Sequence, residues 1–155
     1  ILRTTAFARS AETTAEEIIV LAFEVDDMTG EEVATAGDFL RALSGVLDLT
    51  FSNVIGKKSR PAVRFELLVR PAHLEEVVDA CFAQTSTIGL RWFLQQRKVL
   101  ERSHLSQQGL RIKVVERPGG SETTKVEQDD LSRFSTLAER RAKQHELYFG
   151  AGGSK

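Results

Sequence analysis

The order of hydrophobic patterns along the chain restricts its fold more than any other feature of the sequence. From residue 18 to residue 100, an apolar run is followed by a helical pattern, two alternating segments, a second helical pattern and another apolar segment. Apolar runs and strict alternation are typical of strands, whereas apolar residues three or four positions apart are typical of amphipathic helices. The predicted order of elements is therefore βαββαβ.

The first strand and the first helix are predicted from residues 18–43. Ile18–Val25 is an apolar run rich in β-branched residues, which is typical of a buried strand. Thr29 and Glu32 have the spacing of a capping box, in which each side chain bonds a free backbone N–H at the start of a helix. Apolar residues then recur at helical spacing at Val33, Ala36, Leu40 and Leu43. The strand is thus expected to run almost directly into the helix.

Residues 47–69 predict a hairpin. Apolar and polar residues alternate in Leu47–Ile55 and again in Val63–Val69, as expected for strands with one wet face. Between them, Gly56–Pro61 has the glycine and proline of a turn. These two strands are therefore expected to pair with each other.

A second helix and a fourth strand complete the order. Pro71 suits the first turn of a helix, because its missing N–H would be unpaired there anyway, and Cys81 lies on the apolar stripe that follows. A strand is predicted from Leu90 to Leu94, extending toward Leu100, with Trp92 expected in the core. Two helical crossovers separated by a hairpin are typical of a ferredoxin-like α+β sandwich.

The domain boundaries follow from where this pattern ends. We predict a ferredoxin-like domain over residues 18–100, an additional strand and helix over 101–149, and a flexible tail over 150–155. The additional strand is expected at Leu110–Val114, and the last helix is expected to be capped by Asp129 or Asp130. Residues 1–17 are expected to be a linker from a missing N-terminal domain, because the chain begins with Ile1 rather than Met.

Composition excludes several classes of partner. With 21 Lys and Arg against 22 Asp and Glu, the net charge is -1, so no global field attracts nucleic acid or an anionic membrane. The single cysteine, Cys81, excludes an internal disulfide, and no apolar run reaches the roughly 18 residues of a membrane span. We therefore expect a cytoplasmic protein with no nucleic-acid and no membrane partner, in which any anion binds to a local cluster.

Two polar segments at the ends of predicted elements are candidates for such a cluster. Asp26 and Asp27 follow the first strand, where carboxylates either complement the helix dipole or hold Mg²⁺ together with substrate phosphates. Lys57, Lys58 and Arg60 place three cations in four residues at the hairpin turn. A nucleoside triphosphate would neutralise them, although a solvated turn explains the same composition.

A third polar segment follows the second helix. Thr85, Thr87 and Arg91 surround Gly89, and hydroxyls with a guanidinium can line a phosphate or a ribose. A helix end followed by a strand arginine is the structural alternative. Because remote segments of a βαββαβ fold can meet at one edge of the sheet, we expect the three segments to form one composite site.

These three segments, in this order, resemble motifs of the LarC-type nickel insertion proteins. Asp26–Glu31 resembles the DDMTGE motif, Lys57–Arg60 resembles the K-K-x-R turn, and Thr85–Arg91 resembles the end of the E-T-T-T-I-G-x-R stretch. Three positions depart from the family pattern, since Glu24 stands in place of Asn, Gln84 in place of Glu and Ser86 in place of Thr. The resemblance identifies the chain as the C-terminal, CTP-binding half of such a protein.

The resemblance implies a function. Family members insert nickel into a pyridinium bis-thiocarboxylate mononucleotide to complete the cofactor of lactate racemase, and they consume CTP with Mg²⁺ or Mn²⁺. The implied roles are metal binding by Asp26 and Asp27, and nucleotide binding by Lys57, Lys58, Arg60, Thr85, Thr87 and Arg91. Nickel is expected to be held mainly by the missing N-terminal region, so this segment is not expected to act alone. The resemblance also implies a homo-oligomer, and no catalytic residue is assigned.

Two other functions fit the same fold. A non-enzymatic ferredoxin-like domain for ligand sensing or oligomerisation would show no metal-dependent response to CTP. RNA binding on the sheet requires exposed aromatic residues on the central strands and a basic face. The strand Val63–Val69 offers only Phe65, which we expect in the core.

Overall fold

The computed structural model describes residues 13–150 of the chain, with side chains described from residue 16 to residue 148. The chain forms two compact units, of which one is Ala15–Arg97 and the other contains the residues from Lys98 onwards. Most of the expected linker, residues 1–12, and residues 151–155 of the expected tail lie outside the described residues.

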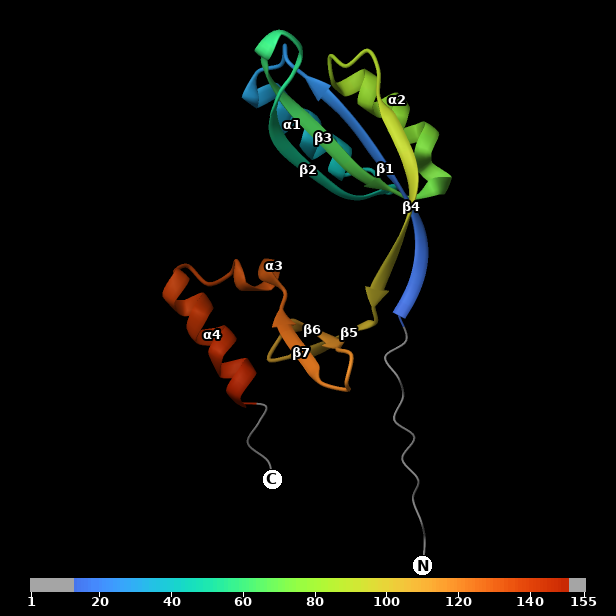
Figure 1. Cartoon of the computed structure of the whole chain (residues 1–155). Coiled ribbons are helices and arrows are strands. Elements are labelled where there is room, and N and C mark those ends of the chain that lie inside the picture. Colours follow the sequence, from blue (N-terminus) through green and yellow to red (C-terminus); the bar gives the residue numbers. More distant parts are fainter. Residues whose placement is uncertain (1–12, 151–155) are drawn as a thin grey trace, which may run out of the picture. The chain divides into compact units, whose positions relative to one another are not determined.

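The first unit is a four-stranded sheet with two helices on one face (Figure 1). Its strands are β1 (Thr13–Val25), β2 (Val46–Ile55), β3 (Pro61–Val69) and β4 (Arg91–Leu100), in the order β2-β3-β1-β4. Its helices are α1 (Gly30–Arg41) and α2 (Leu74–Gln84), with the 3-10 turns η1 (Lys57–Ser59) and η2 (Pro71–His73). Helices connect β1 to β2 and β3 to β4, so the predicted ferredoxin-like βαββαβ fold is confirmed.

The core of this unit lies between the sheet and the helices, because alternate residues of the central strands are apolar. Phe23 of β1 stacks on Phe65 of β3 with ring centroids 4.7 Å apart, and Phe51 of β2 meets Phe65 edge-on at 4.8 Å. Leu40 from α1 and Cys81 from α2 pack against them and are fully buried, as predicted for Cys81. Phe65 is therefore unable to serve as a stacking platform for a base.

The residues between these apolar positions point to the opposite face of the sheet. In the β1–β3 register, Phe23 pairs with Phe65 and Glu24 pairs with Arg64. Since successive side chains of a strand alternate between faces, Glu24 and Arg64 point away from the helices.

The start of α1 is fixed by the predicted capping box. The Thr29 hydroxyl accepts a hydrogen bond from the Glu32 N–H at 3.3 Å, and the Thr29 N–H donates to the Glu32 carboxylate at 2.7 Å. These bonds to Thr29 lower the pKa of Glu32. Because the helix begins at Gly30, the two aspartates that follow β1 lie in a short connection of defined geometry.

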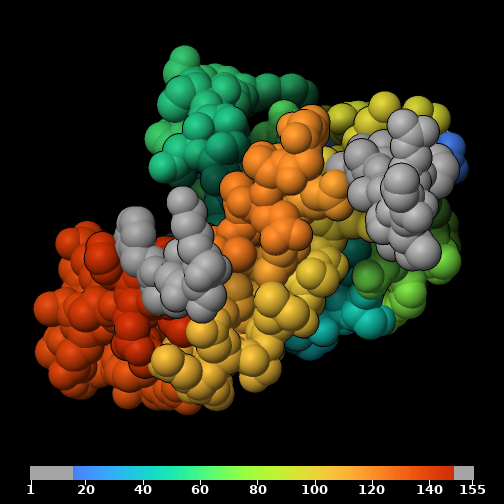
Figure 2. All heavy atoms as spheres, turned by 90° about the horizontal axis from the view of Figure 1, so that it is seen from below, coloured from blue at the N-terminus to red at the C-terminus, as the bar shows by residue number. Residues whose placement is uncertain are grey.

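The second unit is a three-stranded antiparallel sheet with two helices. Its elements are β5 (Arg102–Gln107), β6 (Leu110–Glu116), β7 (Glu122–Val126), α3 (Gln128–Leu131) and α4 (Leu137–Gly150), and the strand order is β5-β6-β7. Leu131 of α3 and Leu147 of α4 are buried against the apolar side of β6. In Figure 2 the red atoms of α4 lie beside the amber and orange atoms of these strands.

The sequence predicted this unit incompletely. The expected strand is present as β6, but β5 and β7 flank it, and the expected single helix is interrupted between Leu131 and Leu137. Thr136 and Glu139 form a second capping box there, with bonds of 3.1 and 3.2 Å. The N-cap of α3 is Glu127, so Asp129 and Asp130 lie inside the first turn of the helix, and Asp130 forms an ion pair with Arg111 at 2.9 Å. The predicted cap at Asp129 or Asp130 is therefore wrong.

The prediction that Trp92 lies in the core is also wrong. Trp92, Phe93 and Leu94 are 49%, 57% and 57% exposed. They lie on β4, which is an edge strand of its sheet.

None of the described helices is both long and apolar enough to cross a membrane.

Candidate functional site

The carboxyl end of β1 lies between the other two polar segments that the sequence analysis singled out. In Figure 1 the β2–β3 turn and the α2–β4 loop lie at the same end of the unit as the arrowhead of β1. A carboxylate oxygen of Asp26 lies 3.4 Å from Nη1 of Arg60 in the turn. Asp27 accepts a hydrogen bond from the Ser86 hydroxyl in the loop. The two adjacent aspartates thus connect segments that are far apart in the sequence.

Two hollows border this strand end. The first, of about 530 Å³, is lined by Glu24 and Asp26 together with Lys57 and Arg64. The second, of about 370 Å³, is lined by residues of β1 and of the loop, namely Glu24, Val25, Asp26, Asp27, Ser86, Thr87, Ile88 and Gly89. Because Lys57 and Arg64 line the first hollow together with Glu24 and Asp26, a ligand with charges of both signs can contact basic and acidic groups there.

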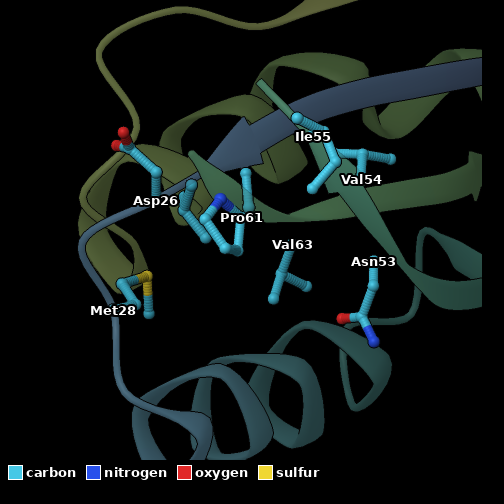
Figure 3. A pocket seen from close by; sticks show the side chains of 9 residues that line it. Asp26, Met28, Asn53, Val54, Ile55, Pro61 and Val63 are labelled. Atoms are coloured by element: carbon cyan, nitrogen blue, oxygen red, sulfur yellow. The ribbon is translucent and has the colours of Figure 1, made fainter. Parts of the chain in front are cut away.

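A third hollow, shown in Figure 3, differs in character. It has a volume of about 340 Å³, and most of its lining is apolar, including Met28, Ile55 and Val63. Figure 3 shows the Asp26 carboxylate directed away from Val63 and Asn53. The apolar hollow therefore adjoins the first charged hollow and shares Asp26 with it.

Two of the three cations in the turn between β2 and β3, Lys57 and Lys58, have no ion-pair partner among the described residues. Lys58 and Ser59 have φ angles of 57° and 58°, in the left-handed region that side chains rarely adopt. The Gly56 N–H donates to the Arg60 carbonyl at 2.8 Å and closes the turn. Residues with strained backbone angles of this kind often cluster at active sites and ligand-binding segments.

The α2–β4 loop is held by its own hydroxyls. The Thr85 hydroxyl donates to the Cys81 carbonyl at 2.7 Å, at the end of α2, and the Thr87 hydroxyl donates to the Gly89 carbonyl at 2.8 Å. Thr87 lines the second hollow, whereas Thr85 lines a separate hollow beside the start of α1. Thr87 thus lines the hollow that both aspartates line, and Thr85 does not.

Arg91 is engaged by a carboxylate that the sequence analysis did not assign to the site. Its guanidinium makes two bonds to Glu24, one of them 2.9 Å long between Nη1 and Oε2. The hydrogen bond from Arg91, aided by the charges of Arg91 and Arg64, lowers the pKa of Glu24. Glu24 is therefore ionised at neutral pH and neutralises Arg91.

Arg64 is the second residue that the sequence analysis missed. Its Nη1 lies 3.8 Å from Glu24, and its Nη2 donates to Glu66 at 3.0 Å. In the sequence, Glu24 and Arg64 look like ordinary polar positions within strands, and only the cross-strand register places them side by side. The signal that could have found them is their position near the strand ends that carry the predicted site, since Glu24 is the next-to-last residue of β1 and Arg64 is the fourth residue of β3.

The aspartates suit a hard divalent cation that also has other ligands. No group of three or more His, Cys, Asp or Glu side chains within residues 16–148 is arranged to hold a metal ion. Asp26 and Asp27 line one hollow together with the Ser86 hydroxyl, so the available donors are all oxygens. Mg²⁺ is typically held by one or two carboxylates plus waters and substrate phosphates. The donor set thus fits a metal ion that arrives with a phosphate ligand.

The fold and the site together define a ferredoxin-like domain with an edge suited to a phosphate–metal complex. Residues 1–144 match the sequence model of a family described as nickel insertion protein. The chain belongs to the nickel insertion protein family, which confirms the resemblance seen in the three motifs.

The similar proteins are longer than this chain. It is 34% identical over 111 residues to the pyridinium-3,5-bisthiocarboxylic acid mononucleotide nickel insertion protein of Acetivibrio thermocellus, covering 70% of this chain and 27% of that protein. It is 34% identical over 87 residues to the protein of the same name from Geobacillus kaustophilus, covering 56% of this chain and 21% of that protein. The chain thus spans about a quarter of the length of these curated relatives.

A solved structure has the same fold. It is described as LarC2, the C-terminal domain of a cyclometallase involved in the synthesis of the NPN cofactor of lactate racemase, in the apo form. The TM-score is 0.78 at 23% sequence identity, and the match covers 90% of this chain and 99% of that one.

Proposed function

We propose that this domain binds CTP together with Mg²⁺ or Mn²⁺ at the carboxyl end of β1, as part of a protein that inserts nickel into a pyridinium bis-thiocarboxylate mononucleotide. The observation that carries the proposal is the meeting of Asp26 and Asp27 with the cationic turn and the hydroxyl-rich loop. The names of the relatives support the mononucleotide as substrate. The motif resemblance supports CTP.

The proposed roles follow from charge and position. Asp26 and Asp27 hold the divalent cation, which neutralises phosphate charge when it is bound. Lys57 lines the first hollow, and it binds the triphosphate together with Lys58 and Arg60. Oriented cations act most strongly where negative charge increases during phosphoryl or nucleotidyl chemistry, so the turn favours the transition state over the bound substrate.

The loop and β4 position the nucleotide in this proposal. Thr87 offers its hydroxyl oxygen in the second hollow, and Thr85 supports the loop from the end of α2. Arg91 binds a phosphate oxygen or the ribose once its carboxylate partner is exchanged. Nickel is the substrate metal and is held mainly by the longer protein, so the domain alone binds nucleotide without completing the insertion. Self-association of the domain belongs to the same proposal.

A thermal-shift screen tests this function directly. The domain is heated with CTP, ATP, GTP or UTP, each with Mg²⁺, with Mn²⁺ and with EDTA. CTP with a divalent cation is expected to raise the Tm most, since a ligand at 100 times its Kd stabilises a protein by about 2.7 kcal/mol. If no nucleotide raises the Tm with either metal, the proposal fails, and a non-enzymatic ligand-sensing or oligomerisation domain becomes the better account.

A further inference from the structure

Three charged residues form a row across the face of the sheet opposite the helices. Glu24 in the middle strand β1 is the register partner of Arg64 in β3, and it is bonded by Arg91 of β4 on its other side. We propose that Arg64 and Arg91 form a two-arginine phosphate site, and that Glu24 is its resident counter-ion, which a bound phosphate group replaces. The proposal rests on the proposed function for the identity of the natural ligand.

The geometry is that of a carboxylate held between two guanidinium groups. Arg91 contacts both oxygens of Glu24, and Nη1 of Arg64 lies 3.8 Å from Oε1. Arginine binds carboxylate and phosphate through the same pair of parallel N–H groups. A surface that holds one carboxylate in this way is therefore already shaped for a phosphate group.

Arg64 has an unused donor at the same place. Its Nε is buried and has no hydrogen-bond partner among the described residues. A buried donor without a partner is costly, so a shift of the Arg64 side chain that brought this N–H to a phosphate oxygen would be favourable. Arg64 also lines the 530 Å³ hollow together with Lys57, which carries a cation without an ion-pair partner among the residues described. A phosphate group in this hollow would thus meet Arg64 and Lys57 at once.

The exchange is favoured by charge. Glu24 brings one negative charge to two guanidinium groups, whereas a triphosphate brings at least three. The pair that must be broken is partly exposed to solvent, since the side chains of Arg91 and Glu24 are 58% and 33% exposed. Exposed ion pairs contribute little net stability, so a multivalent anion can displace one of them. Glu24 consequently lowers the affinity of the site for weak anions and leaves multivalent ones able to bind.

Calorimetric titration with inorganic tripolyphosphate, without metal and at low ionic strength, tests the counter-ion role. Glu24→Gln removes the competing charge and is expected to bind tripolyphosphate about tenfold more tightly than the unmodified chain, or about 1.4 kcal/mol. Glu16→Gln is the matched control, because Glu16 contacts Arg97 at 2.6 Å across the same two strands. It makes the same charge change away from the site and is expected to change the affinity less than about twofold.

Arg64 is tested in the Glu24→Gln background. Adding Arg64→Gln is expected to remove most of the gain in tripolyphosphate affinity. Arg64→Lys keeps the charge but loses the paired N–H groups, so its affinity is expected to lie between those of Glu24→Gln and the Arg64→Gln variant. Thermal melts establish that each variant is folded. The proposal is overturned if folded Glu24→Gln binds tripolyphosphate no more tightly than the unmodified chain. Weaker binding overturns it too, and would make Glu24 a direct contributor to the site.

The same variants distinguish failure of the two-arginine site from failure of the CTP proposal. If Glu24→Gln and Arg64→Gln shift tripolyphosphate affinity as expected but no nucleotide binds with metal, the two-arginine site stands and the CTP proposal falls. If CTP binds with metal while neither variant changes tripolyphosphate or CTP affinity, the CTP proposal stands and the two-arginine site is wrong.

Discussion

The ring of Phe51 lies against Gly37, in the position that a side chain on residue 37 would occupy. A Cβ atom on Gly37 would lie 2.3 Å from Cζ of the ring, which is far inside van der Waals contact. A Cβ on Gly30, in the first turn of the same helix, would meet nothing within 4 Å. The close approach of α1 to β2 therefore depends on glycine at position 37.

Gly37→Ala is expected to lower the free energy of unfolding by about 1–3 kcal/mol, as overpacking does in other cores. This loss exceeds the gain of about 1 kcal/mol that alanine brings to a helix interior. Gly30→Ala is the control and is expected to change stability by less than about 1 kcal/mol. Urea unfolding measures both variants, and equal stability of the two would show that the Phe51 ring moves aside freely.

The cationic turn is expected to dominate nucleotide affinity. Lys58→Ala with Arg60→Ala is expected to weaken CTP binding by about 1–3 kcal/mol, because each loses a charged contact to phosphate. Calorimetry with CTP and Mg²⁺ measures the change. Arg117→Ala with Lys125→Ala removes the same charge around the β6–β7 hairpin and is expected to leave CTP affinity unchanged. Unchanged affinity in the Lys58 and Arg60 variant contradicts the assignment of the turn.

The paired aspartates are expected to determine the metal dependence of binding. Asp26→Asn with Asp27→Asn removes both charged oxygen ligands, so CTP affinity is expected to become nearly the same with Mg²⁺ and with EDTA. Asp38→Asn is the control, since Asp38 lies on α1 and pairs with Arg41. A double variant that retains its full response to Mg²⁺ shows that the metal is held by other groups.

The ion pair between Glu24 and Arg91 is expected to make stability depend on pH in a defined direction. The hydrogen bond from Arg91 lowers the pKa of Glu24 below its usual value of 4.5. A carboxylate with a lowered pKa in the folded state stabilises above its unfolded pKa, and this stabilisation is lost as pH falls through the folded pKa. The stability difference between the unmodified chain and Glu24→Gln should thus be constant near neutral pH and shrink below 4.5.

Urea unfolding of both proteins at a series of pH values from neutral to acidic measures this difference. A stability difference that stays the same through the acidic range would contradict the pairing of Glu24 with Arg91 in solution.

The single cysteine is expected to report on unfolding. Cys81 is fully buried against the sheet, and burial raises its pKa to about 12. The thiolate is the reactive form, so Ellman's reagent should react with native protein only as fast as the domain opens. Labelling at pH 8 is expected to accelerate steeply across the urea unfolding transition. Rapid, complete labelling without urea would contradict the burial of Cys81.

The sequence predicted the elements whose hydrophobic pattern is set by a buried face. In α1, β3 and α2 one side of each element contacts the core, so hydrophobic periodicity identified them. β1 was identified by its continuous apolar run, because consecutive residues from Ile18 to Phe23 are buried. β5 and β7 were missed because most of their side chains are exposed and no apolar alternation marks them. The break before α4 was missed because Leu131 and Phe134 continue the helical spacing across it. The capping-box spacing of Thr136 and Glu139 was the available signal.

The candidate site was predictable to the extent that its parts lie at the ends of elements. Asp26, the basic turn and the loop after α2 were recognised as candidates because polar residues interrupt apolar patterns there. Glu24 and Arg64 were not found, because their proximity depends on the pairing of β1 with β3 over a sequence distance that local patterns do not span. Trp92 was misplaced for a related reason, since position at the edge of a sheet is decided by strand order.

The alternation within β1 also has a consequence for changes in chain length. Phe23 and Val25 enter the core, while Glu24 points to the other face and Asp26 borders the charged hollows. Inserting or deleting one residue ahead of Phe23 would exchange these two sets, bringing a carboxylate into the apolar interior and an aromatic ring to the opposite face of the sheet. A one-residue insertion or deletion in the strand would therefore disrupt both the apolar core and the charged face of the sheet.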